Sequence, residues 1–121
     1  MVRIRAMRVE DAETVGRMDA LDYDRDPEKG HKVAKEHALE HLKIVPENCY
    51  VVEDEEGTIV GAMVLHPRKD VFEIEDFHVK DIETNREALA LLKKKLLERL
   101  KDVETEVLCC PYAARRLVEL P

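Results

Sequence analysis

Glutamine is absent from the sequence, asparagine occurs only as Asn48 and Asn85, and there are three cysteines. An odd number of cysteines without regular spacing excludes a disulfide framework and a cysteine-based metal motif. We therefore predict that Cys49, Cys109 and Cys110 are buried free thiols. Few amide side chains among many Glu, Lys and Arg residues are typical of proteins from hot environments, so a thermophilic source is expected.

Long apolar runs are also missing. No run approaches the roughly 18 residues that a membrane-spanning helix needs. The first residues, MVRIRAMRVED, are too charged to form the apolar region of a secretory signal. We therefore expect a cytoplasmic protein with no membrane partner.

Charge is plentiful, but its signs are mixed. Charged residues make up 39% of the chain, and the net charge is −7. Nucleic-acid-binding proteins concentrate positive charge on one face, and the sequence has no extended basic block of that kind. The composition argues against nucleic acid and favours a cationic or amine partner. The 121 residues suit one hydrophobic core, so a single domain over residues 1–121 is predicted.

The spacing of apolar residues predicts a mixture of strands and helices. Strands are predicted at residues 2–8, 49–52, 59–65, 71–80 and 105–110, and helices at about residues 10–22, 33–45, 84–103 and 112–120. A polar turn containing Pro27 and Gly30 separates the first two helices. The order is therefore βααβββαβα, with an antiparallel meander of three strands in its middle.

Local residues refine this prediction. Gly57 can adopt the positive φ that the hairpin between the second and third strands needs. The sequence Thr84-Asn85-Arg86-Glu87 matches a capping box, so it is expected to open the strongest helix. In the strand at residues 71–80, strict alternation divides the side chains between two faces. One face carries Val71, Glu73, Glu75, Phe77 and Val79, and the other carries Phe72, Ile74, Asp76, His78 and Lys80.

The order of elements and several segments resemble the GNAT family of N-acetyltransferases. The segment IRA followed by Asp11 is similar to the family's first strand and helix, and EDEEGTIVGAMVL is similar to its second and third strands. IEDFHV before a long helix is similar to the fourth strand, and CCPYAARRLVEL to the segment that precedes the final hairpin. The resemblance implies an α/β fold of GNAT type, with a mixed sheet of about five strands and helices on both faces.

The resemblance also implies an activity and its partners. GNAT enzymes transfer an acetyl group from acetyl-CoA to an amine, which here would belong to a small molecule or a peptide. The chain ends at Pro121, where the family continues into a last hairpin. Without that hairpin the fifth strand lacks a neighbour, so we expect a homodimer in which a second subunit completes the site.

By the same resemblance, Glu73 is the expected general base. Glu73-Ile74 together with Val79 repeats the spacing found in the fourth strand of histone-type members. Glu75 lies on the same predicted face and is the second candidate, and His78 is a third. An exposed strand carboxylate remains the alternative interpretation of Glu73. The backbone of Phe77, His78 and Val79 is expected to pair with the pantetheine arm of acetyl-CoA.

The pyrophosphate of acetyl-CoA is bound in the family by a Q/R-x-x-G-x-G/A loop at a helix N-terminus. This chain has Asn85-x-x-Ala88-x-Ala90 or Arg86-x-x-Leu89-x-Leu91 at the corresponding place. The resemblance therefore makes Asn85, Arg86 and Ala88 the expected pyrophosphate contacts.

Other positions depart from the family pattern. No glycine follows Gly61, and Glu87 in a capping role would occupy the amides that a phosphate needs. Members commonly place a tyrosine acid where this chain has Val118, and Tyr112 lies six residues earlier. The alternative function is a non-catalytic GNAT-fold module that binds a protein or a small ligand.

His37 and His41 belong to an H-x-x-E-H pattern, which places two imidazoles one helical turn apart. Such a pair can hold zinc, but the sequence supplies no evident third ligand, so no bound metal is expected. The helix borders the acceptor groove in a GNAT fold, so either histidine could contact a substrate.

Overall fold

The structure is a computed structural model that describes residues 1–22 and 30–109. Its elements are β1 (Arg3–Ala6), α1 (Ala12–Asp22), α2 (Gly30–Ile44), β2 (Cys49–Glu53), β3 (Ile59–Pro67), β4 (Val71–Val79), α3 (Arg86–Leu100) and β5 (Glu106–Cys109). Short 3₁₀ turns, η1 (Val9–Asp11) and η2 (Pro46–Asn48), precede α1 and β2. The predicted order is confirmed through β5. The predicted last helix, Cys110 and most of the turn after Asp22 lie outside the described residues.

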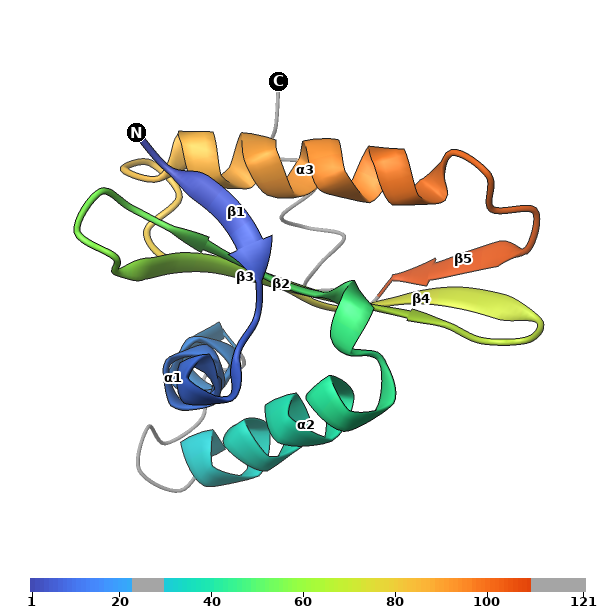
Figure 1. Cartoon of the computed structure of the whole chain (residues 1–121), viewed down its shortest axis with the longest axis horizontal. Helices are drawn as coiled ribbons and strands as arrows, with labels where there is room; N and C mark the ends of the chain where they lie inside the picture. The colour runs from blue at the N-terminus through green and yellow to red at the C-terminus, as the bar shows by residue number, and fades with distance from the viewer. Residues whose placement is uncertain (23–29, 110–121) are drawn as a thin grey trace.

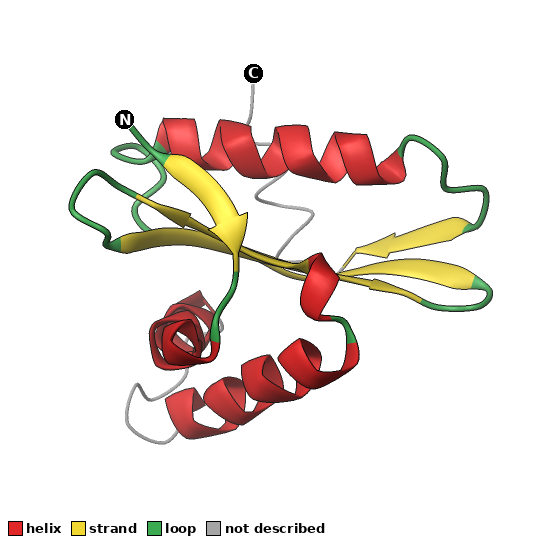
Figure 2. Ribbon diagram, in the orientation of Figure 1, coloured by secondary structure: helices red, strands yellow, loops and turns green. Residues whose placement is uncertain are grey.

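The strands form one mixed sheet in the order β1-β2-β3-β4-β5. Neighbouring strands from β1 to β4 are antiparallel, whereas β5 is parallel to β4. The parallel pairing arises because α3 carries the chain back across one face of the sheet (Figure 1). The helices α1 and α2 cover the other face (Figure 2). A mixed sheet with helices on both faces is therefore confirmed.

An apolar cluster fills each side of the sheet. On the α3 side it contains Val52, Val60, Met63, Leu65, Phe72, Ile74, Phe77, Val79, Ala88, Leu89, Leu92 and Leu96. On the side of α1 and α2 it contains Met7, Ala12, Val15, Met18, Ala38, Val45, Cys49, Val51, Ile59, Ala62 and Val64. Each fully buried large apolar side chain stabilises the fold by about 1.5–3 kcal/mol relative to exposure, so these clusters hold the three layers together.

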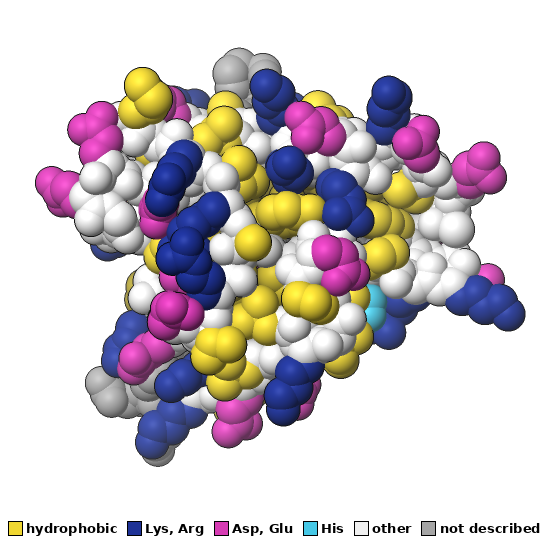
Figure 3. Space-filling model, viewed as in Figure 1, with side chains coloured by type: hydrophobic (Ala, Val, Ile, Leu, Met, Phe, Trp, Pro, Cys, Tyr) yellow, Lys and Arg dark blue, Asp and Glu magenta, His cyan; other side chains and the backbone are white. Residues whose placement is uncertain are grey.

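The surface carries charges of both signs, interspersed as the sequence indicated. Figure 3 shows acidic and basic side chains mixed over one face of the molecule. Gly57 has a φ of 82°, which confirms the predicted glycine turn between β2 and β3. Within residues 1–22 and 30–109, no helix has the length and apolar character needed to cross a bilayer.

β4 contains a bulge that the sequence analysis did not predict. In the pairing of β3 with β4, Val64 lies opposite Asp76 and Leu65 lies opposite Ile74. Glu75 is therefore an extra residue on β4 without its own partner on β3.

The bulge changes which side chains share a face. Phe72 and Ile74 before it, and Phe77 and Val79 after it, all pack in the apolar cluster under α3. The prediction that Phe77 and Val79 lie on the same face as Glu73 was wrong, because strict alternation does not allow for one inserted residue.

The start of α3 also differs from the prediction. The helix begins at Arg86, its N-cap is Asn85, and the Asn85 side chain makes no capping hydrogen bond. The Thr84 hydroxyl instead donates to Asp81 Oδ2 at 2.8 Å. The predicted capping box was therefore wrong, because the helix begins one residue later than the box requires and Asn85, not Thr84, stands at the N-cap. Glu87 consequently does not act as the partner of a Thr84 cap.

Candidate active site

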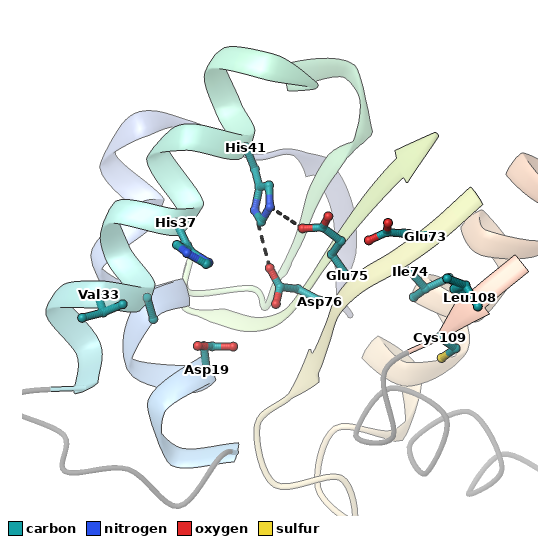
Figure 4. Close-up of a pocket in the computed structure, with 11 residues that line it drawn as sticks. Asp19, Val33, His37, His41, Glu73, Ile74, Glu75, Asp76, Leu108 and Cys109 are labelled. Carbon is teal, nitrogen blue, oxygen red and sulfur yellow. Dashed lines mark ion pairs between the residues drawn. The ribbon is translucent and has the colours of Figure 1, made fainter. Parts of the chain in front are cut away.

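A cleft with a volume of about 530 Å³ opens between the two-helix layer and the β4–β5 side of the sheet. It is lined by Asp19 of α1, by Val33, Ala34, His37 and His41 of α2, by residues 73–76 of β4, and by Leu108 and Cys109 of β5. Figure 4 shows these side chains gathered around one space. The cleft therefore joins four elements that are distant in the sequence.

The opening lies where β4 and β5 stop pairing. The two strands pair only from Val71 opposite Glu106 to Ile74 opposite Cys109. Beyond Ile74, no strand within the described part of the chain pairs with this edge of β4. The backbone from Asp76 to Val79 is paired with β3 on its other side, so this edge of β4 is unpaired within residues 1–22 and 30–109.

Both glutamates among the candidate bases line the cleft. Glu73 Oε1 accepts a hydrogen bond from Arg68 Nε at 2.6 Å, and its side chain is 28% exposed. Glu75 Oε1 is 3.3 Å from Arg68 Nη2 and 3.1 Å from His66 Nδ1. Glu75 also forms an ion pair through Oε2 with His41 Nε2. Glu73 therefore has fewer partners than Glu75.

His41 lines the cleft from α2. It is buried, and its two ring nitrogens face two carboxylates of β4 (Figure 4). Nε2 contacts Glu75, while Nδ1 lies 3.7 Å from Asp76 Oδ2 and makes no hydrogen bond. The rings of His37 and His66 lie 6.1 and 6.3 Å from the His41 ring, measured between centroids.

A second cluster of ionisable side chains, formed by Asp19, Asp76 and His78, lies beside His41. His78 is 1% exposed, and its Nε2 is 3.1 Å from Asp19 Oδ1 and 3.5 Å from Asp76 Oδ1. Nε2 of His78 therefore lies close to carboxylates from α1 and β4. Its backbone, which the sequence analysis assigned to pantetheine, lies on the edge of β4 described above.

The connection from β4 to α3 contains the expected pyrophosphate contacts. Asp81 has a φ of 43°, and the Asn85 side chain donates to the carbonyl oxygens of Lys80 and Asp81. Arg86 is exposed, whereas Ala88 is fully buried in the cluster under α3. Only the backbone of Ala88 could therefore approach a phosphate.

Negative charge dominates the cleft. Its described lining residues include the carboxylates of Asp19, Glu73, Glu75 and Asp76 and no lysine or arginine. The nearby Arg68 contacts two of these carboxylates from the rim. Such a lining attracts a positively charged group.

Sequence reasoning missed Asp19, His66 and Asp76. The apolar residues of β4 fall at positions 72 and 74 and then at 77 and 79, and this change from even to odd numbers was the available signal for the bulge. With the bulge included, Asp76 and His78 turn to the same side as Glu73. Asp19 and His66 carried no comparable signal, because their positions depend on tertiary packing.

No protein-family model and no curated protein sequence matches the chain. Solved structures do match its fold. A Pyrococcus horikoshii protein assigned as an acetyltransferase has a TM-score of 0.67 and 16% identity, over 84% of this chain and 36% of that chain. Ard1 from Thermoplasma volcanium has a TM-score of 0.61 and 20% identity, over 81% and 64% of the two chains. A Mycobacterium tuberculosis protein in complex with CoA has a TM-score of 0.61 and 18% identity, over 93% and 69%.

The matched structures also include enzymes described as N-acetyltransferases. The chain therefore has the fold of the GNAT acetyltransferases, as the resemblance implied. It spans 36% and 64% of the lengths of the Pyrococcus and Thermoplasma proteins.

Proposed function

We propose that the protein is an acetyl-CoA-dependent N-acetyltransferase that acts on a cationic amine of a small molecule or a peptide. The observation that carries this proposal is the edge of β4 from Glu75 to Val79, which no described strand pairs and which begins at a bulge inside a carboxylate-lined cleft. Such an edge can pair with an extended amide-containing arm, and the cleft can accept an ammonium group next to the end of that arm. The GNAT-type fold supports the same assignment.

In this proposal the pantetheine arm pairs with the backbone of Phe77, His78 and Val79. The pyrophosphate lies near the start of α3, at Asn85, Arg86 and the amide of Ala88, where the helix dipole favours an anion. The first turn of α3 has no cap from the Asn85 side chain, which supports this placement. The CoA complex of the Mycobacterium tuberculosis protein supports CoA as the cofactor class.

Glu73 acts as the general base in this proposal, with Glu75 as the second candidate. The ammonium group of the acceptor gives a proton to the carboxylate, and the free amine attacks the thioester carbonyl carbon. The C–S bond breaks, and CoA leaves as a thiolate that takes up a proton. Glu73 suits the role because it lines the cleft with fewer contacts than Glu75. The homodimer stays a prediction.

The test is an acetyl-transfer assay in which CoA release is followed with a panel of amines and lysine peptides. Glu73→Gln should lower kcat by about 100-fold or more, since general base catalysis contributes about 10²–10⁴-fold. Acetyl-CoA binding, measured by calorimetry, should be unchanged. Glu56→Gln in the exposed β2–β3 turn is the matched control and should retain full activity. Full activity of Glu73→Gln would rule out Glu73 as the base.

A non-catalytic binding module is the second candidate function. It is favoured by hydrogen bonds within the connection between β4 and α3. The Thr84 and Asn85 side chains donate to Lys80 and Asp81 of the same connection. The acidic residues Asp81, Glu83 and Glu87 are also exposed there and oppose a pyrophosphate. Titration with acetyl-CoA at low salt separates the two functions, because the module predicts no binding up to millimolar cofactor.

A further inference from the structure

The fold brings together two histidines and a glutamate that the sequence keeps far apart. His41 of α2, His66 of β3 and Glu75 of β4 each offer a ligand atom, and these atoms lie within 4.8 Å of one another. We propose that this cluster, the His41–His66–Glu75 site, binds a divalent transition-metal ion of the Zn²⁺ class. The site uses only one histidine of the H-x-x-E-H pattern, and the other ligands come from the sheet.

The donor set matches that ion. Two imidazole nitrogens and one carboxylate form a common three-ligand set for zinc and its neighbours, with a further position open to water or a substrate. Here His41 Nε2 and His66 Nδ1 both face the carboxylate of Glu75. The three side chains are between 11% and 20% exposed, so the ion would be sheltered but still reachable from the cleft.

The surroundings of His41 give an independent reason for a metal. A neutral imidazole has one N–H and one lone pair, yet both nitrogens of His41 face carboxylate oxygens. An ion on Nε2 would leave the proton on Nδ1, directed at Asp76. Carboxylates orient metal-binding histidines in this way.

The local charge also favours a cation. Glu73, Glu75 and Asp76 are close neighbours on β4, and Arg68 is the cation that contacts two of them. The side chain of Arg68 is 48% exposed and already holds Glu73 at 2.6 Å. It can therefore release Glu75, from which it lies 3.3 Å away, and keep its pair with Glu73 when an ion binds.

The experiment uses the full chain after treatment with a chelator and dialysis. Titration with Co²⁺ should give visible d–d absorption that saturates at one equivalent, without the charge-transfer band of a cysteine thiolate. Zn²⁺ should displace the Co²⁺ and raise the melting temperature. Acetyl-CoA is absent from this measurement, so its result does not depend on the proposed acetyl transfer.

Variants then locate the ion. Glu75→Gln keeps the shape of the side chain and should weaken Zn²⁺ binding by more than about 100-fold, beyond the 10–100-fold typical of outer-shell changes. His66→Gln should do the same. His37→Gln is the matched control on the same helix, and Asp19→Asn is the control for the neighbouring Asp19, Asp76 and His78 group. Both controls should bind the ion as the parent protein does.

Three results would overturn the proposal. One is the absence of stoichiometric Co²⁺ or Zn²⁺ binding to a protein that circular dichroism shows to be folded. Another is binding that Glu75→Gln and His66→Gln both leave unchanged. Loss of binding in Asp19→Asn alone would place the ion in the neighbouring group and would equally contradict the His41–His66–Glu75 site.

Discussion

Arg5 and Asp11 form a bidentate ion pair that links β1 to the turn before α1. Arg5 Nη1 donates to Asp11 Oδ2 at 2.8 Å, and Nη2 donates to Oδ1 at 3.0 Å. The Arg8 amide also donates to Asp11 Oδ2, at 2.8 Å. Burial alone would raise the pKa of the Asp11 carboxyl, but these hydrogen bonds outweigh burial and hold the pKa below its usual range.

This pair predicts a pH-dependent contribution to stability. The Asp11 carboxyl has a lower pKa when folded than when unfolded, where it is about 3.9, so its contribution is complete above that value. The contribution is lost as the pH falls through the folded-state pKa. Asp11→Asn should cost about 2 kcal/mol near neutral pH, because a mostly buried arginine loses a charged partner.

Urea unfolding of the parent and of Asp11→Asn at several pH values checks this prediction. The difference in the free energy of unfolding should shrink as the pH falls below about 4. Glu98→Gln is the control, because Glu98 forms an exposed i,i+3 pair with Lys95 at 3.4 Å. That change should cost less than about 0.5 kcal/mol. A constant difference between parent and Asp11→Asn across the pH range would contradict the assignment.

Gly61 and Leu92 lie in close contact where α3 crosses β3. A Cβ at position 61 would lie 3.1 Å from Leu92 Cδ1, and Leu92 is fully buried. Gly61→Ala should therefore destabilise the protein by about 1–3 kcal/mol through overpacking. In a Leu92→Ala background the same change should be neutral or stabilising, since the clashing atom is gone. A double-mutant cycle by urea unfolding measures this coupling.

Gly57→Ala is the matched control for that cycle. Gly57 has a positive φ of 82°, and a Cβ added there would meet no atom within 4 Å, so only the backbone conformation opposes alanine. It should cost about 1 kcal/mol with or without Leu92→Ala. Equal costs of Gly61→Ala in both backgrounds would show that Leu92 does not limit the side chain at position 61.

Cys49 is predicted to be unreactive in the folded protein. Burial, together with repulsion from Asp76, Glu47 and Glu75, raises the pKa of its thiol to about 12. Iodoacetamide at mildly alkaline pH should therefore leave Cys49 unmodified until urea unfolds the chain. Peptide mapping by mass spectrometry reads each cysteine separately. Labelling of Cys49 at the same rate in native buffer and in urea would contradict the prediction.

The sequence was sufficient for the elements whose signals are local. The apolar stripe of α3 and Gly57 were recognised because helix period and turn chemistry depend on neighbouring residues. Cys49 is buried as predicted, whereas Cys109 is only partly buried, since β5 has a described neighbour on one side only. The predicted Thr84 cap was wrong because the helix begins one residue later, with Asn85 at the N-cap.

The candidate site was less accessible to sequence reasoning. Glu73 and Glu75 could be placed on one side because they are two residues apart in a strand. The bulge could not be placed by strict alternation, so Asp76 was assigned to the wrong face. His66 joins the site only because β3 pairs with β4 in a particular register, with His66 opposite Glu73. Contacts of this kind are set by tertiary structure.

The bulge makes a prediction about single-residue deletions in β4. Deleting Glu75 removes the inserted residue, so Ile74 and Asp76 keep their partners on β3 and every other side chain keeps its face. The deletion should cost no more stability than Glu75→Ala, which removes the same side chain but keeps the bulge. Urea unfolding of both variants, which should each be cooperative, compares their free energies of unfolding.

Deletion of Glu73 is the matched control, because it removes the same amino acid two positions away. The strand then has two choices in register. It can keep the bulge and turn Phe72 out of the cluster under α3, or lose the bulge and place Glu75 in that cluster. Either choice disrupts the buried face, and loss of a buried phenylalanine costs about 3–5 kcal/mol. The variant that lacks Glu73 should therefore have a free energy of unfolding at least about 2 kcal/mol lower than the variant that lacks Glu75. Equal stabilities would mean that residues 68–70 absorb the shift and that the bulge does not fix the register of β4.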